Sequence, residues 1–130
     1  AHNAYFDVMK YAYYARSIYP QKRVLRPSDV SFASICAKEA ACREAQIHYL
    51  KIIEDIETTP ELLTTLTAYL LDHESSMANT AKALCCHINT IKYRLNSIRD
   101  NTGYSPSKPA DVYPLLIAVA INRMKNSENE

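Results

Sequence analysis

Apolar positions recur at helical spacing along most of the chain, and prolines or short polar stretches interrupt them. Between Asn3 and Tyr19 apolar residues return every three or four positions, which predicts a first helix that ends before a proline. A second helical stretch is predicted from roughly Phe32 to Glu57, and Ser31 can cap its start. Acidic side chains near the end of this stretch oppose the helix dipole, so we expect an internal break near Ala41 or Gln46.

The segment between these two stretches is short and basic. Lys22–Val30 contains one apolar pair and a proline, a pattern that fits an edge strand or an extended connector. One strand cannot form a sheet alone, so the first 30 residues are expected to be the end of a neighbouring domain whose other strands lie outside this sequence. The run Thr58–Pro60 predicts a boundary, after which residues 58–130 form a second domain.

The chain after this boundary predicts a packing helix followed by a much shorter one. Glu61–His73 is predicted to be a helix packed against a core, because apolar residues recur on one of its faces, at Leu62, Leu63, Leu66, Tyr69 and Leu70. Ser75 and Ser76 offer an N-cap for a short helix over Met77–Leu84, whose small and apolar residues recur three positions apart.

Two longer helices are predicted towards the C-terminus. Asn89–Asn101 has a regular apolar face and stops before Gly103, the only glycine in the chain, where a left-handed cap is wanted. Asp111–Lys125 has Pro114 in its first turn and is apolar nearly all round, so it must pack on several sides or bind a partner. Its apolar run Leu115–Ile121 is too short to cross a bilayer. The expected fold is a mostly α helical bundle without a membrane span, in a cytoplasmic protein.

Charge and cysteine content limit the possible chemistry. Residues 76–108 contain five basic side chains and one acidic side chain, whereas residues 38–75 carry a net charge of −5. This segregation supports an anionic partner only together with other features. No two cysteines have a CxxC spacing, and Cys85 and Cys86 are adjacent. We therefore expect the cysteines to be small buried apolar residues, with no metal site, disulfide or cofactor.

Catalysis is not expected from this sequence. The candidate carboxylates lie close together in Glu54–Glu57 and in Asp72–Glu74, and neighbouring side chains on a helix diverge instead of converging on a substrate. The chain has no glycine-rich phosphate loop and no serine or cysteine in a nucleophile motif.

Ser76–Asn96 combines a short helix, a tight turn and a longer helix, which is the helix-turn-helix arrangement. Small Ala81 would let the two helices approach each other. The space between them would be filled by Leu84, Cys86 and Ile91. Ser76 and Thr80 would face outward towards a phosphate backbone. Cys85 stands where a glycine is usual in such a turn, and any pair of packed helices could show similar apolar spacing.

The outward face of the second of these helices has the chemistry of base and phosphate recognition. We project the residues around the helix axis at about 100° per residue, and the outward face is the one opposite the buried apolar residues. That face carries Asn89, Tyr93, Asn96 and Asp100, flanked by Thr90 and Lys92. Asparagine can read an adenine edge, lysine and threonine can hold phosphates, and tyrosine can do either. A polar face that is merely solvated is the alternative.

Two further residues near this face have more than one possible role. The imidazole of His87, in the turn, could cap the helix, touch a phosphate or remain in solvent, and contact with DNA is the interpretation we favour. Arg94 projects nearer the buried side. It could form a structural ion pair with Glu61 or Asp72, or it could contact DNA.

The run NTAKALCCHINTIKYRLNSIRDNTGY, residues 79–104, resembles the C-terminal domain of the PucR/CdaR family of bacterial transcription regulators. The likeness is most specific at Asn89–Leu95 and extends over Leu62–Asn122. It implies a Fis-like helix-turn-helix that binds double-stranded DNA. The predicted DNA-binding residues are Ser76, His87, Asn89, Thr90, Lys92, Tyr93, Arg94 and Asn96. Family members commonly carry an arginine where this chain has Ile88, which removes one expected cation from the DNA face.

The resemblance also implies a biological setting. Such regulators control catabolic or secondary-metabolic operons, such as those for purines, sugar diacids or polyketide synthase expression. We expect a fragment of a longer protein that acts as a homodimer, with any small-molecule effector bound by a missing upstream domain. Residues 1–57 resemble the truncated C-terminal end of an upstream α/β linking domain of the degenerate cyclase-like kind, including a short strand at Arg23 and Val24.

A second hypothesis is a helical module for dimerisation or another protein partner, without DNA binding. Its surface would be the final helix and the tyrosine-rich first helix. The tyrosines concerned are Tyr11, Tyr13 and Tyr14.

Overall fold

The computed structural model describes residues 2–128, with side-chain environments for residues 9–127, and every regular element in this range is helical. In chain order the elements are α1 (His2–Ile18), α2 (Pro27–Ala41), α3 (Arg43–Ile52), α4 (Glu54–Glu57), α5 (Pro60–Thr67), the π-helical turn η1 (Ala68–Asp72), α6 (Met77–Ala83), α7 (Ile88–Thr102) and α8 (Pro109–Glu128). The predicted mostly α class is confirmed.

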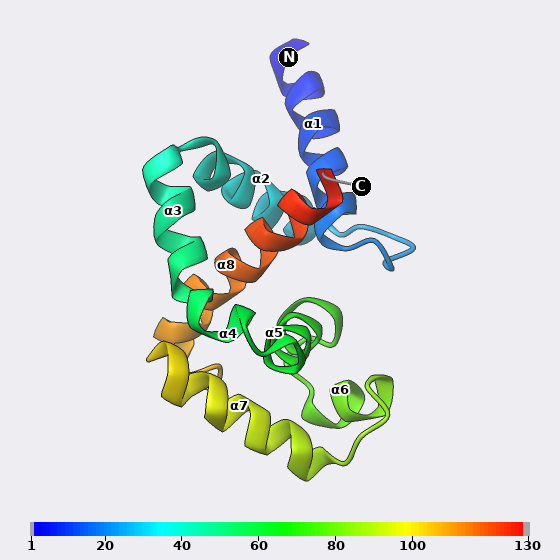
Figure 1. The fold of residues 1–130 in the computed structure, drawn as a ribbon. Helices are drawn as coiled ribbons and strands as arrows, with labels where there is room; N and C mark the ends of the chain where they lie inside the picture. The colour runs from blue at the N-terminus through cyan, green and yellow to red at the C-terminus, as the bar shows by residue number, and fades with distance from the viewer. Residues whose placement is uncertain (1, 129–130) are drawn as a thin grey trace.

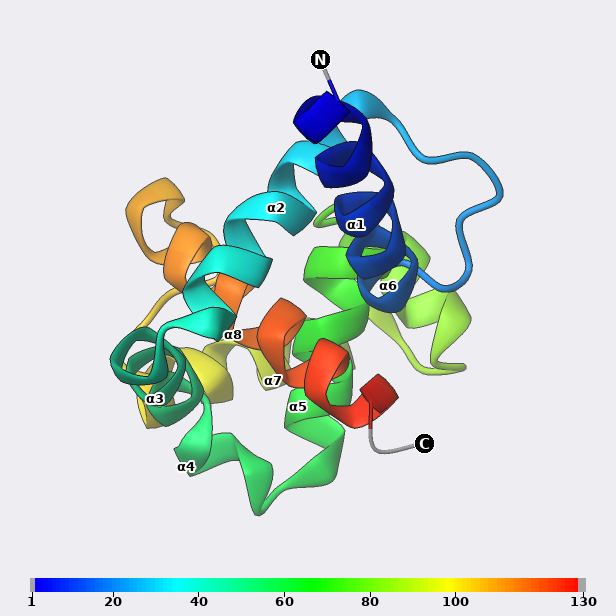
Figure 2. The same cartoon turned by 90° about the horizontal axis from the view of Figure 1, so that it is seen from above.

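Helix α8 runs through the middle of the molecule (Figures 1 and 2). It contacts α1, α2 and α3 from the first half of the chain, and α5 and η1 from the second half. Helices α6 and α7 form the edge of the molecule opposite the start of α1, at the bottom of Figure 1. The helix-turn-helix region is therefore presented at one end of the fold.

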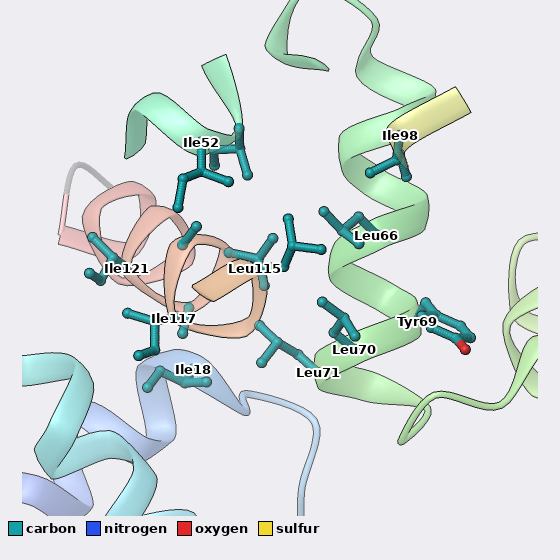
Figure 3. Close-up of a cluster of buried hydrophobic side chains, with 14 of the residues drawn as sticks. Ile18, Ile52, Leu66, Tyr69, Leu70, Leu71, Ile98, Leu115, Ile117 and Ile121 are labelled. Carbon is teal, nitrogen blue, oxygen red and sulfur yellow. The ribbon is translucent and has the colours of Figure 1, made fainter. Parts of the chain in front are cut away.

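The core is built around α8, and Figure 3 shows its side chains meeting those of the surrounding helices. Leu115, Ile117 and Ile121 are at most 1% exposed. They belong to the same cluster as Ile18 from α1 and Leu66 from α5. Burying each such aliphatic side chain contributes about 1.5–3 kcal/mol. Of the two alternatives for the apolar final helix, packing on several sides is the one that the structure shows.

Of the two alternatives for Lys22–Val30, the edge strand is wrong, and the connector is right for the first part of the segment. The segment is a loop as far as Arg26, and α2 begins at Pro27. Pro27 suits the first helical turn because it has no backbone N–H to leave unpaired. The Asp29 carboxylate accepts a hydrogen bond from the backbone N–H of Arg26 at 2.9 Å, which caps the helix from inside its first turn. Ser31 consequently lies within α2 and is not its cap.

The short strand predicted at Arg23 and Val24 is absent as well. Val24 is 78% exposed, so its apolar side chain packs against no sheet. The Arg16 guanidinium, on α1, donates to the backbone carbonyls of Lys22 and Arg23. These carbonyls therefore bond to a side chain of the preceding helix and not to a neighbouring strand.

The second helical stretch is interrupted twice. The predicted break near Ala41 is confirmed, because Cys42 takes an extended backbone conformation between α2 and α3. A second break at Ile53, between α3 and α4, was not predicted. The predicted start of a helix at Pro60 is confirmed, since α5 begins at that residue.

The final helix begins earlier than its sequence pattern predicts. Pro109 occupies the first turn of α8, and Pro114 lies inside the helix. Because Pro114 has no N–H, the carbonyl of Ala110 lacks its usual helical partner. At the start of the helix, the Asp111 carboxylate accepts a hydrogen bond from the backbone N–H of Ser105 at 3.0 Å, which closes the preceding loop.

The cysteines are less uniform than predicted. All four are free thiols, and Cys36 is buried in the core, where burial and the nearby Glu39 carboxylate raise its pKa to about 12. Cys86 is half-buried, but Cys42 and Cys85 are exposed, so the expectation of four buried residues is wrong for these two. Both exposed cysteines lie between helices, where the chain turns.

Candidate nucleic-acid interface

The helix that supports the candidate interface is α5 with its continuation η1. Of the residues that the periodicity places on one face, Leu62, Leu66, Tyr69 and Leu70 are buried, and Leu63 is only half-buried. Sequence reasoning missed the widening of this helix into the π-helical turn η1. After it, Glu74 and Ser75 adopt φ values of 47° and 63°, so a tight left-handed turn leads into α6.

Helix α6 is capped as predicted by Ser76, whose Oγ accepts a hydrogen bond from the Asn79 N–H at 3.2 Å. Thr80 does not face outward, contrary to the prediction. Its side chain is fully buried, and its hydroxyl donates to the Ser76 carbonyl at 2.7 Å.

The turn between α6 and α7 uses a left-handed residue at Cys85, where φ is 55°. The Cys86 N–H donates to the Ala81 carbonyl at 3.0 Å, which is the bond of a helix C-terminus closed by a left-handed residue. Glycine is the residue that adopts this conformation without cost. The prediction that Cys85 takes the place of the usual turn glycine thus matches the backbone.

The two helices meet through the predicted small and apolar residues. Ala81 is 5% exposed and Ile91 is fully buried. Leu84 and Cys86 are half-buried and pack against the same core cluster. Their burial holds α6 against the inner side of α7 and leaves the outer side of α7 free.

Both ends of α7 are closed by local bonds. His87 Nδ1 accepts a hydrogen bond from the Asn89 N–H at 3.1 Å, so this imidazole caps the helix, one of the three roles considered for it. Gly103 has φ of 80°, and its N–H donates to the Arg99 carbonyl at 2.9 Å. The predicted glycine cap is confirmed.

The outer side of α7 carries the predicted polar residues. Ile91, Leu95 and Ile98 are buried on the inner side. Asn89, Lys92, Tyr93 and Asn96 are exposed, and Thr90 is half-buried. Tyr93 is 72% exposed, the most exposed of the aromatic residues that stand among the exposed large hydrophobics.

The two ends of this face differ in charge. Near its C-terminal end, Arg99 and Asp100 form an ion pair at 3.4 Å. Lys92, near the N-terminal end, takes part in none of the ion pairs among the described side chains. An uncompensated positive charge therefore lies where a recognition helix contacts bases and phosphates.

Arg94 has neither of the ion-pair partners considered for it. Asp72 is bonded to Arg123 of α8 at 2.7 and 3.0 Å. The Arg94 Nη1 instead donates to the hydroxyl of Thr65, on α5, at 3.2 Å. Periodicity correctly placed Arg94 near the buried side, but it could not identify a partner 29 positions away.

Two of the carboxylates considered for catalysis are paired with different arginines. Asp72 pairs with Arg123 as described, and Glu74 pairs with Arg26 at 3.3 Å. No group of three or more histidine, cysteine, aspartate or glutamate side chains in the described residues is arranged to hold a metal ion. No helix within residues 2–128 is long and apolar enough to span a bilayer.

Comparison with known proteins agrees with this geometry. The family described as the PucR C-terminal helix-turn-helix domain matches residues 62–121, which include α5, η1, α6, α7 and most of α8. The match shows that residues 62–121 are similar to this family. Domains of this kind are DNA-binding parts of transcription regulators and are not an enzyme family.

Curated relatives include proteins of Mycobacterium tuberculosis and Mycobacterium bovis whose names describe them only as uncharacterized proteins. Each is 40% identical over 65 residues, which is 50% of this chain but only 16% of the relative. The chain therefore spans a small part of the length of these relatives. No solved structure matches this chain.

Proposed function

We propose that this PucR-type domain is the sequence-specific DNA-binding output domain of a bacterial transcription regulator. The observation that carries the proposal is the exposed polar face on the N-terminal half of α7. It offers amide, phenol and ammonium groups on a helix whose opposite side is buried. A major groove accommodates an α-helix that presents such groups to base edges.

Each residue of the face has a proposed role. Asn89 and Asn96 read base edges, and Tyr93 contacts a base or a sugar. Lys92 and Thr90 bind phosphates on the flanks, and so does Arg94. At the helix ends, the Ser76 and His87 side chains contact the DNA backbone in addition to capping α6 and α7.

The wider setting of the domain is also a proposal. Residues 58–130 form the output domain, and residues 1–57 are the end of the preceding linking domain, to which any effector-binding segment is attached upstream. The regulator is a cytoplasmic homodimer whose two domains read half-sites about one DNA turn apart. It controls a catabolic or secondary-metabolic operon, of the kind that handles purines, sugar diacids or polyketides.

The experiment that tests this function is fluorescence anisotropy of the chain with duplexes from the neighbourhood of its own gene, at two salt concentrations. We expect one preferred duplex and binding that weakens steeply with salt. Asn89→Ala should remove the preference at a cost of about 1–3 kcal/mol in specific binding. The matched control is Asn126→Ala, because Asn126 is an exposed asparagine near the C-terminal end of α8.

Two results would contradict the proposal. If the chain binds no duplex even at low salt, the proposed DNA-binding function is refuted. If Asn89→Ala lowers the affinity for all duplexes equally, the base-reading role of Asn89 is refuted and only non-specific binding is supported.

The alternative function is protein interaction through α1. Met9 and Tyr13 lie one helical turn apart and are 56% and 64% exposed, whereas Tyr11 and Tyr14 are half-buried. The final helix contributes little to such a surface because its apolar residues are in the core. Self-association that does not depend on salt, without binding to any duplex, would favour this alternative.

A further inference from the structure

The contact between Arg94 and Thr65 joins the candidate recognition helix α7 to the supporting helix α5. Thr65 is fully buried, and its hydroxyl donates to the Glu61 carbonyl at 2.6 Å. Because a hydroxyl has one hydrogen, the lone pairs of this oxygen remain to accept the bond from Arg94 at 3.2 Å. The oxygen is held by its own helix and thus offers the guanidinium a fixed anchor.

The positive charge of Arg94 is not neutralised by this contact. The ion pairs among the described side chains involve other residues, so no described carboxylate lies within 4.0 Å of this guanidinium. A guanidinium has five N–H donors, and Thr65 accepts from one nitrogen. No buried side-chain nitrogen or oxygen in the described residues lacks a hydrogen-bond partner, so the remaining donors of Arg94 reach the surface. A half-buried cation of this kind is well suited to an external anion.

The position of Arg94 on α7 complements that of Lys92. Residues two positions apart on a helix project about 160° from each other, so the two cations lie on different sides of the exposed face. Side chains on a helix also lean towards its N-terminus, which brings the Arg94 guanidinium towards the end that carries Asn89. The two strands of a duplex place phosphates on both sides of a helix in the major groove.

We infer that Thr65 is a positioning residue of the DNA interface, whose hydroxyl holds the Arg94 guanidinium so that its free N–H donors bind a backbone phosphate. This inference rests on the proposed DNA-binding function. Thr65 touches no DNA itself. Its loss releases the arginine side chain and weakens binding to all sequences alike, because phosphate contacts carry no direct sequence information.

The test measures DNA affinity over a series of salt concentrations for the whole chain and for Thr65→Val, Thr65→Ser and Arg94→Gln. Valine keeps the shape of threonine but removes the acceptor, whereas serine keeps the hydroxyl. We expect Thr65→Val to lose about three- to tenfold in affinity. The slope of log affinity against log salt should become shallower by up to about one, as for the loss of one phosphate contact. Thr65→Ser should behave like the unchanged chain.

The double variant Thr65→Val with Arg94→Gln separates positioning from a general structural effect. If Thr65 acts through Arg94, the double variant binds no more weakly than Arg94→Gln alone. Thermal unfolding by circular dichroism identifies any variant that is not folded at the assay temperature. In that case Thr65→Ala replaces Thr65→Val in the same series.

The outcomes distinguish this inference from the function on which it rests. Failure of the unchanged chain to bind any duplex refutes the DNA-binding function itself. If the chain binds but Thr65→Val keeps its affinity and salt slope, the function stands and the positioning role is refuted. The role is also refuted if Thr65→Val weakens binding further in the Arg94→Gln background, or if it changes the preferred duplex.

Discussion

Helices α7 and α8 are the two long helices of the C-terminal half, with 15 and 20 residues, and they are held in opposite ways. Local bonds from His87 and Gly103 close the ends of α7, which buries one side and exposes the other. Helix α8 contains an interior proline, and helices from both halves of the chain pack around it. A helix that carries its own end signals can leave a face free for a partner, whereas α8 depends on the core that surrounds it.

The largest effect is expected on stability, for a substitution in the core helix α8. Ile121→Ala removes a fully buried side chain of α8 and should lower the free energy of unfolding by about 2–5 kcal/mol, since the cavity left behind adds to the lost transfer energy. Chemical denaturation measures this loss. The matched control is Ile47→Ala on α3, where the isoleucine is 56% exposed. Similar losses for the two variants would contradict the central role of α8.

A smaller effect, on binding and not on stability, is expected on the outer side of α7. Tyr93→Ala should weaken DNA binding by about 1–3 kcal/mol if Tyr93 contacts a base. Its free energy of unfolding should change by less than about 0.5 kcal/mol, because the side chain is largely in solvent. Anisotropy and denaturation measure the two quantities.

Tyr113 on α8 offers the control for this variant, since it is 51% exposed against 72% for Tyr93. Tyr113→Ala should leave DNA binding unchanged. If the two tyrosine variants lose the same affinity, the effect of Tyr93→Ala is not specific to the outer side of α7. The distinction between α7 as the DNA-binding helix and α8 as the core helix would then be wrong.

The smallest effect is expected in the turn that leads into α7. Cys85→Gly should raise the free energy of unfolding by about 1 kcal/mol, because a left-handed backbone costs a non-glycine residue about that much. Thermal or chemical denaturation measures the gain. Cys85→Ala is the control, since alanine loses the thiol but keeps the strained backbone. Equal stability of the glycine and alanine variants would show that backbone strain at this turn is negligible.

Most of the candidate interface was predictable because it depends on residues that are close in the chain. The spacing of Ile91, Leu95 and Ile98 identifies the buried side of α7, and the polar face follows from it. Thr80 shows where this approach fails. Its position on a very short helix gave no reliable periodicity, and it packs inward with its hydroxyl bonded to the backbone.

The loop and the start of α2 show a second kind of failure. A proline after a short basic segment is compatible with an extended connector and also with the first turn of a helix. The Asp29 carboxylate accepts the capping bond from the Arg26 backbone N–H and forms an ion pair with Lys22, and these two contacts select the helix. These are local contacts, but their pattern differs little from that of a solvated charged segment.

By itself, the sequence determined the helical class, the ends of α6 and α7 at Ser76 and Gly103, and the face of α7 that lies outward. Helix caps and apolar periodicity depend on residues a few positions apart, so they can be predicted from the sequence. Only the tertiary structure decided that Arg94 meets Thr65 and that Asp72 meets Arg123, 29 and 51 positions apart. Such partners are chosen by the way whole helices pack, because packing brings together side chains whose separation along the chain carries no periodic signal.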